Sequence, residues 1–245
     1  MRLIVDIGNS RAKVVVLDSC GTTIEERVME DITRQDVAQI AERHPDIHYA
    51  IVATTRGNGE FVKGLLKEYI DYVVDFRPAT TPIPIGNLYH TPETLGADRL
   101  AAAVGVAKMY PDSDIMVIDF GTAITIDYVV GGAFVGGNIS PGVTTRFRAL
   151  ADYTACLPLC NATEEILSYG ATTREAIEQG VMRGVEHEIR GYAEEFLRKN
   201  SENRIIFTGG DAKYFVERIK NAIFADCEPV LFGLNTILEY NAEEL

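Results

Sequence analysis

The chain opens with the apolar run Arg2–Asp6, which ends at an acidic residue and is followed by the turn Gly8-Asn9-Ser10 and the β-branched run Lys13–Leu17. Two such runs around a Gly-Asn turn predict a β-hairpin. Periodicity then predicts an alternation of strands and helices up to the middle of the chain. The expected strands are Ile24–Met29, His48–Thr54 and Tyr72–Phe76, and the expected helices are residues 33–44, Phe61–Tyr69 and Ala97–Met109.

The opening pattern returns in the second half of the chain. The apolar run Asp114–Asp119 ends at an acid, Phe120-Gly121-Thr122 forms the turn, and Ala123–Val130 is the next strand. A pattern that recurs after nearly half of the chain indicates an internal duplication. We therefore predict an α/β protein made of two copies of one hairpin-led module, residues 1–112 and residues 113–245.

Apolar positions in the remainder predict mainly helices. The stripe Ile177, Val181, Val185, Ile189, Tyr192 and Phe196 describes one face of a helix of about 25 residues, and Thr172 with Glu175 forms a capping box ahead of it. This stripe either covers the module's own sheet or packs against a second copy of the chain. Other expected elements are a strand at Ala133–Gly137, a helix at residues 141–152, a strand at Arg204–Thr208, a helix at Ala212–Lys220 and a helix after Pro229.

Composition excludes several classes of protein. The 245 residues carry a net charge of −13, which argues against a general nucleic-acid binder, because such proteins neutralise phosphates with Lys and Arg. A small anion site remains possible, since net charge describes the whole surface. The four cysteines are too few for a disulfide framework and are expected to be free, mostly buried thiols. The early polar residues do not fit a signal peptide, so we expect a cytoplasmic protein.

Three glycine-containing turns after strands are candidate nucleotide-binding sites, the first two of them for phosphate groups. At the first, Gly8 would let a phosphate approach the backbone amides, Ser10 and Lys13 would add donors, and Asp6 could hold a magnesium ion. The alternative is an ordinary hairpin turn. The second copy, Gly121-Thr122-Ala123, favours the functional reading, because two related turns can clamp a polyphosphate. Thr208-Gly209-Gly210 suits the sugar or base of a nucleotide, and no Walker A sequence is present.

The segment Gly96-Ala97-Asp98-Arg99 opens the alanine-rich helix. Asp98 could be a general base with Arg99 as an anion clamp beside it. Asp98 could equally be a residue placed favourably at the positive end of the helix dipole. Tyr89 precedes this segment in a proline-rich stretch, where it is either part of the site or a packed surface aromatic residue.

Taken in order, these motifs resemble the type III pantothenate kinases of the acetate and sugar kinase/actin superfamily. The resemblance runs from residue 6 to about residue 210. It rests on Asp6 to Lys13, Tyr89, Gly96 to Arg99, Asp119 to Ala123, Gly136 to Gly142, Gly170 to Thr173, and Thr208 to Gly210.

The resemblance implies two ribonuclease H-like modules with a nucleotide cleft between them, and an enzyme that phosphorylates pantothenate with ATP in coenzyme A synthesis. Asp98 would be the catalytic base, and Asp119 would bind a monovalent cation, K⁺ or NH₄⁺. ATP would bind together with Mg²⁺. The chain would act as a homodimer. The implied ATP-binding residues are Asp6, Ile7, Gly8, Asn9, Ser10, Arg11, Ala12, Lys13, Thr122, Gly209 and Gly210. The implied pantothenate-binding residues are Tyr89, Gly96, Ala97, Asp98, Arg99 and, from the partner subunit, Thr173.

One loop departs from the family pattern. Many members carry a Ser-Val-Val-Pro-like stretch after the strand that ends at Thr54, whereas this chain has Thr54-Thr55-Arg56-Gly57-Asn58. The sequence assigns no role to this loop. Two alternative functions also stay open at this point: a nucleotide-binding regulator that has lost catalysis, and a kinase of another small hydroxy acid or sugar.

Overall fold

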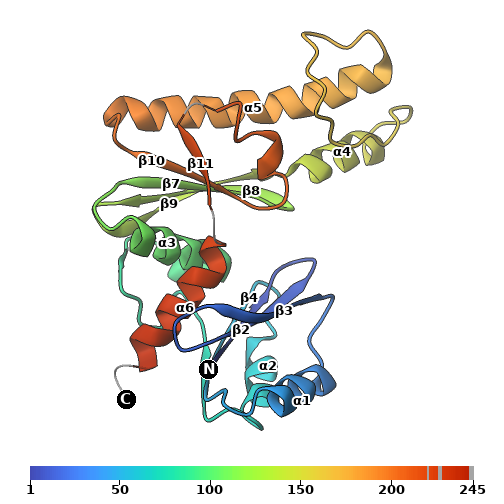
Figure 1. Cartoon of the computed structure of the whole chain (residues 1–245). Coiled ribbons are helices and arrows are strands. Elements are labelled where there is room, and N and C mark those ends of the chain that lie inside the picture. The colour runs from blue at the N-terminus through green and yellow to red at the C-terminus, as the bar shows by residue number, and fades with distance from the viewer. Residues whose placement is uncertain (220, 226–227, 243–245) are drawn as a thin grey trace. The chain divides into compact units, whose positions relative to one another are not determined.

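The computed structural model describes residues 1–219, 221–225 and 228–242, which form two compact α/β units (Figure 1). The first unit holds residues 1–111 and the C-terminal helix, and the second begins at Asp112. The first unit contains β1 (Arg2–Ile7), β2 (Ala12–Leu17), β3 (Thr23–Met29), α1 (Arg34–Arg43), β4 (Tyr49–Thr54), α2 (Gly59–Leu66), β5 (Tyr72–Asp75), β6 (Gly86–Asn87), the 3₁₀ helix η1 (Pro92–Thr94), α3 (Ala97–Met109) and α6 (Pro229–Ala242). The second contains β7 (Ile115–Phe120), β8 (Ala123–Val130), β9 (Ala133–Pro141), α4 (Val143–Asp152), α5 (Thr173–Lys199), β10 (Arg204–Thr208), the 3₁₀ helix η2 (Ala212–Tyr214) and β11 (Ala222–Phe224).

The two units share one sheet topology. In the first the strand order is β3-β2-β1-β4-β5, and in the second the equivalent strands follow the order β9-β8-β7-β10-β11. In both, the first three strands are antiparallel and the last two run parallel to the first. The α/β class is confirmed, and the repeated module that the sequence predicted is present in each unit.

The leading strand of each sheet places an aspartate one residue before its end. Asp6 pairs with Lys13 across the first hairpin, and Asp119 pairs with Thr125 across the second. Because side chains alternate along a strand, each aspartate lies on the face opposite that of the last apolar residue. Register therefore puts the two acidic side chains at equivalent positions of the two modules.

Helices cover both faces of the first sheet. Leu3, Val5 and Ile7 pack with the apolar faces of α1 and α2, and Ile4 lies on the opposite face, where α6 contacts β1 and β4 and α3 contacts β4. A strand that is buried on both faces is continuously apolar, as β1 is from Leu3 to Val5. Burial of this strand therefore fixes the position of the residues that follow it.

Helices α3 and α6 pack closely because a glycine faces the other helix at each contact. A Cβ atom on Gly105 would lie 2.2 Å from the Pro229 carbonyl oxygen, and one on Gly233 would lie 1.8 Å from the Ala101 carbonyl oxygen. This contact holds the C-terminal helix in the first unit. The division at residues 112 and 113 that the sequence suggested placed that helix in the second module, because contacts between segments so distant in the chain leave no local pattern.

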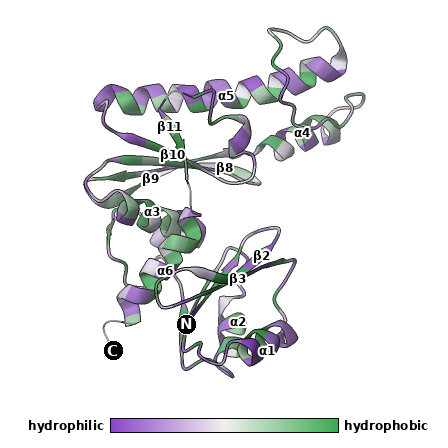
Figure 2. Ribbon diagram, in the orientation of Figure 1, coloured by the Kyte–Doolittle hydropathy of each residue, from purple (hydrophilic) through white to green (hydrophobic). Residues whose placement is uncertain are grey.

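Helix α5 settles the alternatives left open for its apolar stripe. Figure 1 shows α5 lying along the sheet of its own unit, and its amphipathic surface carries both colours in Figure 2. Five of the six stripe residues are buried in the core of that unit, and Tyr192 packs at its margin; the five are Ile177, Val181, Val185, Ile189 and Phe196. The stripe therefore covers its own sheet, and the interpretation that it packs against a second copy is wrong.

The predicted helix over Ala212–Lys220 is also wrong for the part that the structure describes; Lys220 itself lies outside the described residues. Only Ala212–Tyr214 forms a 3₁₀ turn, after which the backbone continues in further turns. The buried ring of Phe215 stacks on Phe120 with a centroid distance of 5.2 Å. This tertiary contact takes precedence over helical propensity. The short strands β6 and β11 were not predicted, since two or three residues give no periodicity.

Cys20 and Cys156 are free and exposed, and Cys160 is free and buried, so the expectation of mostly buried thiols is wrong for two of these three residues.

None of the helices in the described ranges combines the length and apolarity that a membrane span requires.

Replacing Gly233 by alanine should lower the free energy of unfolding by about 1–3 kcal/mol, because overpacking forces the backbones of two helices apart. Gly64→Ala in α2 is the matched control. Nothing lies within 4 Å of a Cβ atom at that position, and alanine favours a helix over glycine by about 0.5–1 kcal/mol. Urea denaturation followed by circular dichroism measures both. Equal stability of Gly233→Ala and the wild-type protein would contradict the proposed close contact.

Candidate functional site

The turn between β1 and β2 is exposed at its tip. Gly8 donates its backbone N–H to the Arg11 carbonyl oxygen at 3.0 Å, whereas Asn9, Ser10 and Arg11 are exposed. Ala12 is buried at the start of β2. The tip therefore offers backbone amides and a hydroxyl group to a ligand, as the sequence predicted for a phosphate loop.

Lys13, on the strand that leaves this turn, forms ion pairs with two acidic side chains. Its Nζ contacts a carboxylate oxygen of Glu228 and lies 3.2 Å from Oε1 of Glu26. Partial burial lowers the pKa of Lys13, but the hydrogen bonds and charges of Glu228 and Glu26 outweigh that effect, so the pKa is raised above its ordinary value. Lys13 is therefore a charged ammonium group at neutral pH.

The start of α3 brings together the residues that the sequence predicted for the second substrate. Asp98 Oδ1 accepts the N–H of Arg99 at 2.8 Å. The Arg99 side chain is 7% exposed and its guanidinium carbon lies 5.8 Å from the centre of the Tyr89 ring, a cation–π arrangement. Gly96 is required beside them, because a Cβ atom there would lie 2.5 Å from Asp98 Oδ1. Consecutive residues thus place a carboxylate and a cationic side chain at the N-terminus of a helix, and both side chains pass close to Gly96.

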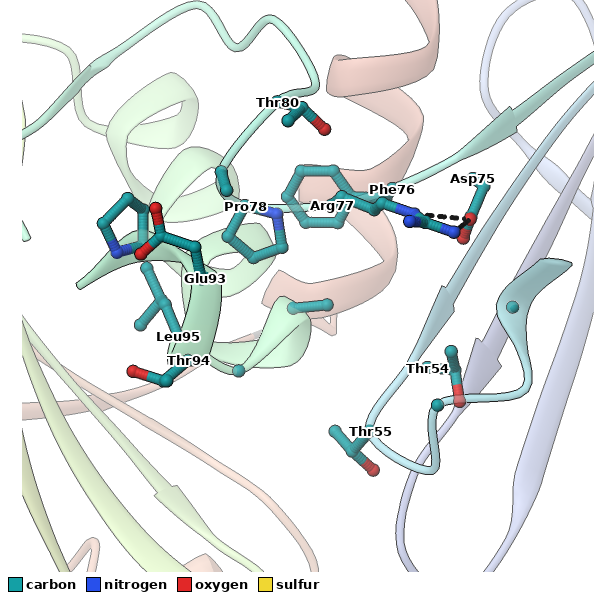
Figure 3. A pocket seen from close by; sticks show the side chains of 16 residues that line it. Thr54, Thr55, Asp75, Phe76, Arg77, Pro78, Thr80, Glu93, Thr94 and Leu95 are labelled. Atoms are coloured by element: carbon teal, nitrogen blue, oxygen red, sulfur yellow. Dashed lines mark hydrogen bonds and ion pairs between the residues drawn. The ribbon is translucent and has the colours of Figure 1, made fainter.

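A pocket of about 600 Å³ lies in the first unit next to Gly96 and Ala97. This volume is within the range of small-molecule sites. Figure 3 shows Thr54 and Thr55 on one side of it and Glu93, Thr94 and Leu95 on the other. We call it the β4–α3 pocket; it is lined by residues of three segments, Thr54 to Gly59, Asp75 to Thr80 and Pro92 to Ala97.

The only cationic side chain lining this pocket, Arg77, is already paired among the described residues. Its Nε and Nη2 atoms bind the Asp75 carboxylate at 2.8 Å, and Nη2 also contacts Glu60 at 2.7 Å (Figure 3). The Asp75 side chain is 4% exposed, so the pair is a fixed part of the wall. The remaining polar side chains of the lining are the hydroxyl groups of four threonines and the carboxylate of Glu93. The hydroxyl groups can form hydrogen bonds with the hydroxyl groups of a small ligand.

In the second unit, the turn after β7 is enclosed by backbone from two other segments. Thr122 accepts hydrogen bonds at its carbonyl oxygen from the Gly142 N–H at 3.0 Å and the Thr145 hydroxyl group at 2.7 Å. Gly209 has a φ of +91°, and a Cβ atom there would lie 2.3 Å from Asp119 Oδ1. The predicted residues Asp119, Thr122 and Gly209 therefore meet at one edge of the second sheet, and the exposed Gly210 follows them.

Thr173 is the exposed first residue of α5. The predicted capping box ahead of it is confirmed, since Thr172 Oγ1 accepts the Glu175 N–H at 3.3 Å while Glu175 accepts the N–H of Thr172 at 3.2 Å. Gly170 packs against this turn, with space for a Cβ atom blocked at 2.2 Å by the Ala176 nitrogen. The capping box and the packing of Gly170 thus fix the backbone that leads into Thr173.

The structure groups the predicted site residues by unit. Residues 6–13, Tyr89 and residues 96–99 belong to the first unit, and Asp119, Thr122, Thr173, Gly209 and Gly210 belong to the second. The sequence missed the pocket walls at residues 54–59 and 75–80. Both segments follow parallel strands, and ligands of α/β sheets bind at the carboxyl ends of such strands, so strand order would have been the signal.

Metal ligands are sparse. Within the described ranges, no group of three or more His, Cys, Asp or Glu side chains could form a metal cage. Mg²⁺ in phosphoryl-transfer sites commonly uses one or two carboxylates together with water and substrate phosphates. The single carboxylates Asp6 and Asp119, each beside a turn rich in oxygen donors, fit that mode.

Comparison with known proteins places the chain in a family. The profile of type III pantothenate kinase matches residues 2–195. The chain is 42% identical over 242 residues to the type III pantothenate kinase of Bacteroides fragilis, with 98% of each chain covered. It is 39% identical over 242 residues to that of Phocaeicola vulgatus, with 98% of this chain and 99% of the relative covered.

A solved structure with a similar fold is the activator of the 2-hydroxyisocaproyl-CoA dehydratase from Clostridium difficile with bound ADPNP. It aligns with a TM-score of 0.54 at 15% identity, over 100% of this chain and 97% of that one. This likeness supports the two-sheet α/β fold. Since the family profile covers well over half of the chain and the relatives align over nearly all of it, the resemblance seen in the sequence is confirmed: the chain belongs to the type III pantothenate kinase family.

Proposed function

We propose that this chain transfers the γ-phosphoryl group of ATP to the primary hydroxyl group of pantothenate. The product is 4′-phosphopantothenate, the first committed intermediate of coenzyme A synthesis. The observation that carries the proposal is the grouping of Tyr89, Gly96, Asp98 and Arg99 at the start of α3. Phosphoryl transfer needs mainly positioning and charge neutralisation, and these residues supply both to a small hydroxy acid.

Asp98 is the proposed catalytic base. Its Oδ1 atom is engaged by the Arg99 N–H, one of the first-turn amides that a helix leaves without an internal partner. Its Oδ2 atom accepts no hydrogen bond from the part of the chain that the structure describes. Oδ2 is therefore the oxygen that takes the proton of the pantothenate hydroxyl group as that group attacks the phosphorus atom.

Arg99 is the proposed partner of the pantothenate carboxylate. A net charge of −13 repels an anionic substrate, so a local cation is needed to hold it. The guanidinium group is oriented against Tyr89, and a planar fork suits a carboxylate group. The β4–α3 pocket borders Gly96 and Ala97, and we assign it to the acceptor substrate.

The ATP phosphates are assigned to the glycine turns. The first turn supplies the tip amides of residues 9–11 with Ser10 and Lys13, and the second unit supplies Thr122. Gly209 and Gly210 leave room for the nucleoside. Gly209 suits this role because its backbone is in the left-handed region and because a side chain there would collide with Asp119.

Two cations are part of the proposal. Asp6 would hold Mg²⁺ in company with the ATP phosphates, and Mg²⁺ would neutralise charge that develops on the transferred group. Asp119 would hold K⁺ or NH₄⁺, since it lies in register with Thr208 and near the carbonyl groups of the turn. Both sites consist of oxygen donors, which hard cations prefer.

We also propose a homodimer in which Thr173 completes the pantothenate site of the partner. The buried stripe of α5 does not support this proposal. Support comes from large apolar side chains that are exposed on β9 and on the long segment between α4 and α5, where Tyr153 and Tyr169 are 90% and 81% exposed. The set is Ile139, Tyr153, Leu159, Ile166 and Tyr169. Apolar exposure of this extent in a segment that leads to Thr173 fits an interface.

The wild-type protein should release ADP with pantothenate and not with a panel of other small alcohols and sugars. Asp98→Asn should lower turnover by about 10²–10⁴-fold, because loss of a general base has this effect, and should still bind MgATP. An enzyme-coupled ADP assay and mass spectrometry of the product measure this. ADP release with another panel member instead would favour a different kinase, and no release with any member would favour a regulator.

Activity should require K⁺ or NH₄⁺. Asp119 is half-buried beside the turn that we assign to the ATP phosphates. A monovalent cation at its carboxylate would offset the repulsion between that carboxylate and the triphosphate. The measurement is turnover after dialysis into Tris with Mg²⁺, followed by titration with KCl, NH₄Cl or NaCl at constant ionic strength. Full activity in the Tris or sodium buffer would contradict this assignment.

Asp98→Asn and Thr173→Ala should complement each other when they are unfolded together in equal amounts and refolded. Random pairing gives one intact site in each mixed dimer, so about a quarter of the wild-type sites should return. Each variant refolded alone is the control. If native mass spectrometry shows mixed dimers but no activity returns, Thr173 does not act across the interface.

A further inference from the structure

The loop Thr54–Asn58, to which the sequence assigned no role, is bonded to the turn between β1 and β2. We infer that Arg56 is a positioning residue for ATP binding: it fixes the peptide that aims the Asn9 N–H at a phosphate group. This inference rests on the proposed function, which places ATP phosphates at this turn. It concerns a residue in a loop that departs from the family pattern, and it deepens that proposal by naming what orients the phosphate donors.

Two consecutive carbonyl groups of the turn accept hydrogen bonds from the loop. The Ile7 carbonyl oxygen accepts the Thr55 N–H at 3.0 Å and the Thr55 hydroxyl group at 3.3 Å. The Gly8 carbonyl oxygen accepts Arg56 Nε at 2.8 Å. Strands β4 and β1 are parallel, with Thr54 in register with Ile7, so the loop leaves the sheet beside the turn.

Arg56 also binds the two residues that follow β3, the strand that pairs with β2. Its Nη1 donates to the Glu30 carbonyl oxygen at 3.1 Å and lies 3.6 Å from Asp31 Oδ1. Nε and Nη1 belong to one rigid planar group, and therefore the two bonds together fix its orientation. The side chain is 25% exposed, so this link between the turn and the end of β3 is partly shielded from water.

Arg56 supplies a donor to a carbonyl group of the turn. Four residues, Gly8 to Arg11, connect Ile7 and Ala12, the last paired residues of the hairpin, and the Gly8 N–H donates to the Arg11 carbonyl oxygen at 3.0 Å. The bond from the Arg11 N–H to the Gly8 carbonyl oxygen is absent from the described backbone hydrogen bonds, and Arg56 supplies the donor to that carbonyl group instead.

Holding the Gly8 carbonyl group sets the direction of the next amide. The Gly8 C=O and the Asn9 N–H belong to one planar trans peptide and point in opposite directions. The bond from Arg56 therefore turns the Asn9 N–H away from the loop. An amide whose direction is fixed before binding donates to a phosphate group without a cost of reorganisation.

The loop is itself held in one conformation. Thr54 Oγ1 accepts the Arg56 N–H at 3.0 Å and donates to Asn58 Oδ1 at 2.8 Å. Gly57 follows with a φ of +76°, a conformation that a side chain would disfavour. Arg56 is thus presented to the turn by a structured loop.

The second unit provides an internal comparison. The Asp211 N–H, in the loop after β10, donates to the Phe120 carbonyl oxygen at 3.3 Å, which repeats the bond from Thr55 to Ile7. No arginine binds the Gly121 carbonyl group in the described second unit; the Gly142 backbone packs there, and a Cβ atom on Gly142 would lie 2.1 Å from that oxygen. The duplicated module keeps the first bond, and the arginine bond is a feature of the first unit.

The test compares MgATP with adenosine, which lacks phosphates, by isothermal titration calorimetry on the full-length chain. Arg56→Ala should raise the Kd for MgATP about tenfold or more, the range for loss of a hydrogen bond from a charged group, and leave the Kd for adenosine within twofold. The KM for pantothenate should also stay within twofold while the KM for ATP rises. Arg34→Ala is the matched control, because it removes an exposed arginine that pairs with Glu68 at 2.7 Å.

Arg56→Lys separates positioning from charge. A lysine keeps the positive charge but cannot reproduce the planar pair of donors, so its affinity for MgATP should stay close to that of Arg56→Ala. Wild-type affinity in Arg56→Lys, or equal losses for MgATP and adenosine in Arg56→Ala, would overturn the inference. If Arg56→Ala fails to fold, Arg56→Lys carries the same comparison. A wild-type protein that binds MgATP no more tightly than adenosine would instead overturn the proposed function.

Discussion

Burial of the leading strand on both of its faces is the constraint on which the rest of each module depends. Strands β1 and β7 are almost entirely apolar up to their aspartate, and helices or neighbouring strands cover them. Such a strand cannot slip by one residue without exposing one set of side chains and burying the other. Its register therefore fixes where Asp6 and Asp119 emerge and where the following turns stand.

The two modules stabilise these turns in different ways. In the first, side chains and backbone of the loop after β4 bind the carbonyl groups of the turn. In the second, Gly142 and Thr145 at the start of α4 enclose it. In the first turn the bond to the Gly8 carbonyl group directs the N–H of the same peptide, that of Asn9, away from the loop, which is the arrangement an anion requires.

Several glycines are required because another part of the chain approaches their backbone closely. Gly105 and Gly233 let α6 pack on α3, and that packing anchors the helix whose first turn holds Asp98. Gly96 gives the Asp98 carboxylate room beside the backbone. The C-terminal helix thus supports the helix that carries the proposed base, through the close contacts at Ala101 and Gly105.

The sequence by itself determined the leading hairpins, the helix α3 with its full bounds, the strands β8 and β10, and the residue types of the site, because these depend on local periodicity and on turn chemistry. Only the tertiary structure decided which segments that are distant in the chain contact one another. It placed the α5 stripe in its own core, replaced the helix after Ala212 with turns through the stacking of Phe215 on Phe120, and joined Arg56 to Gly8 across 48 residues. Such contacts leave no periodic signal, since the energy that selects them comes from residues far apart in the chain.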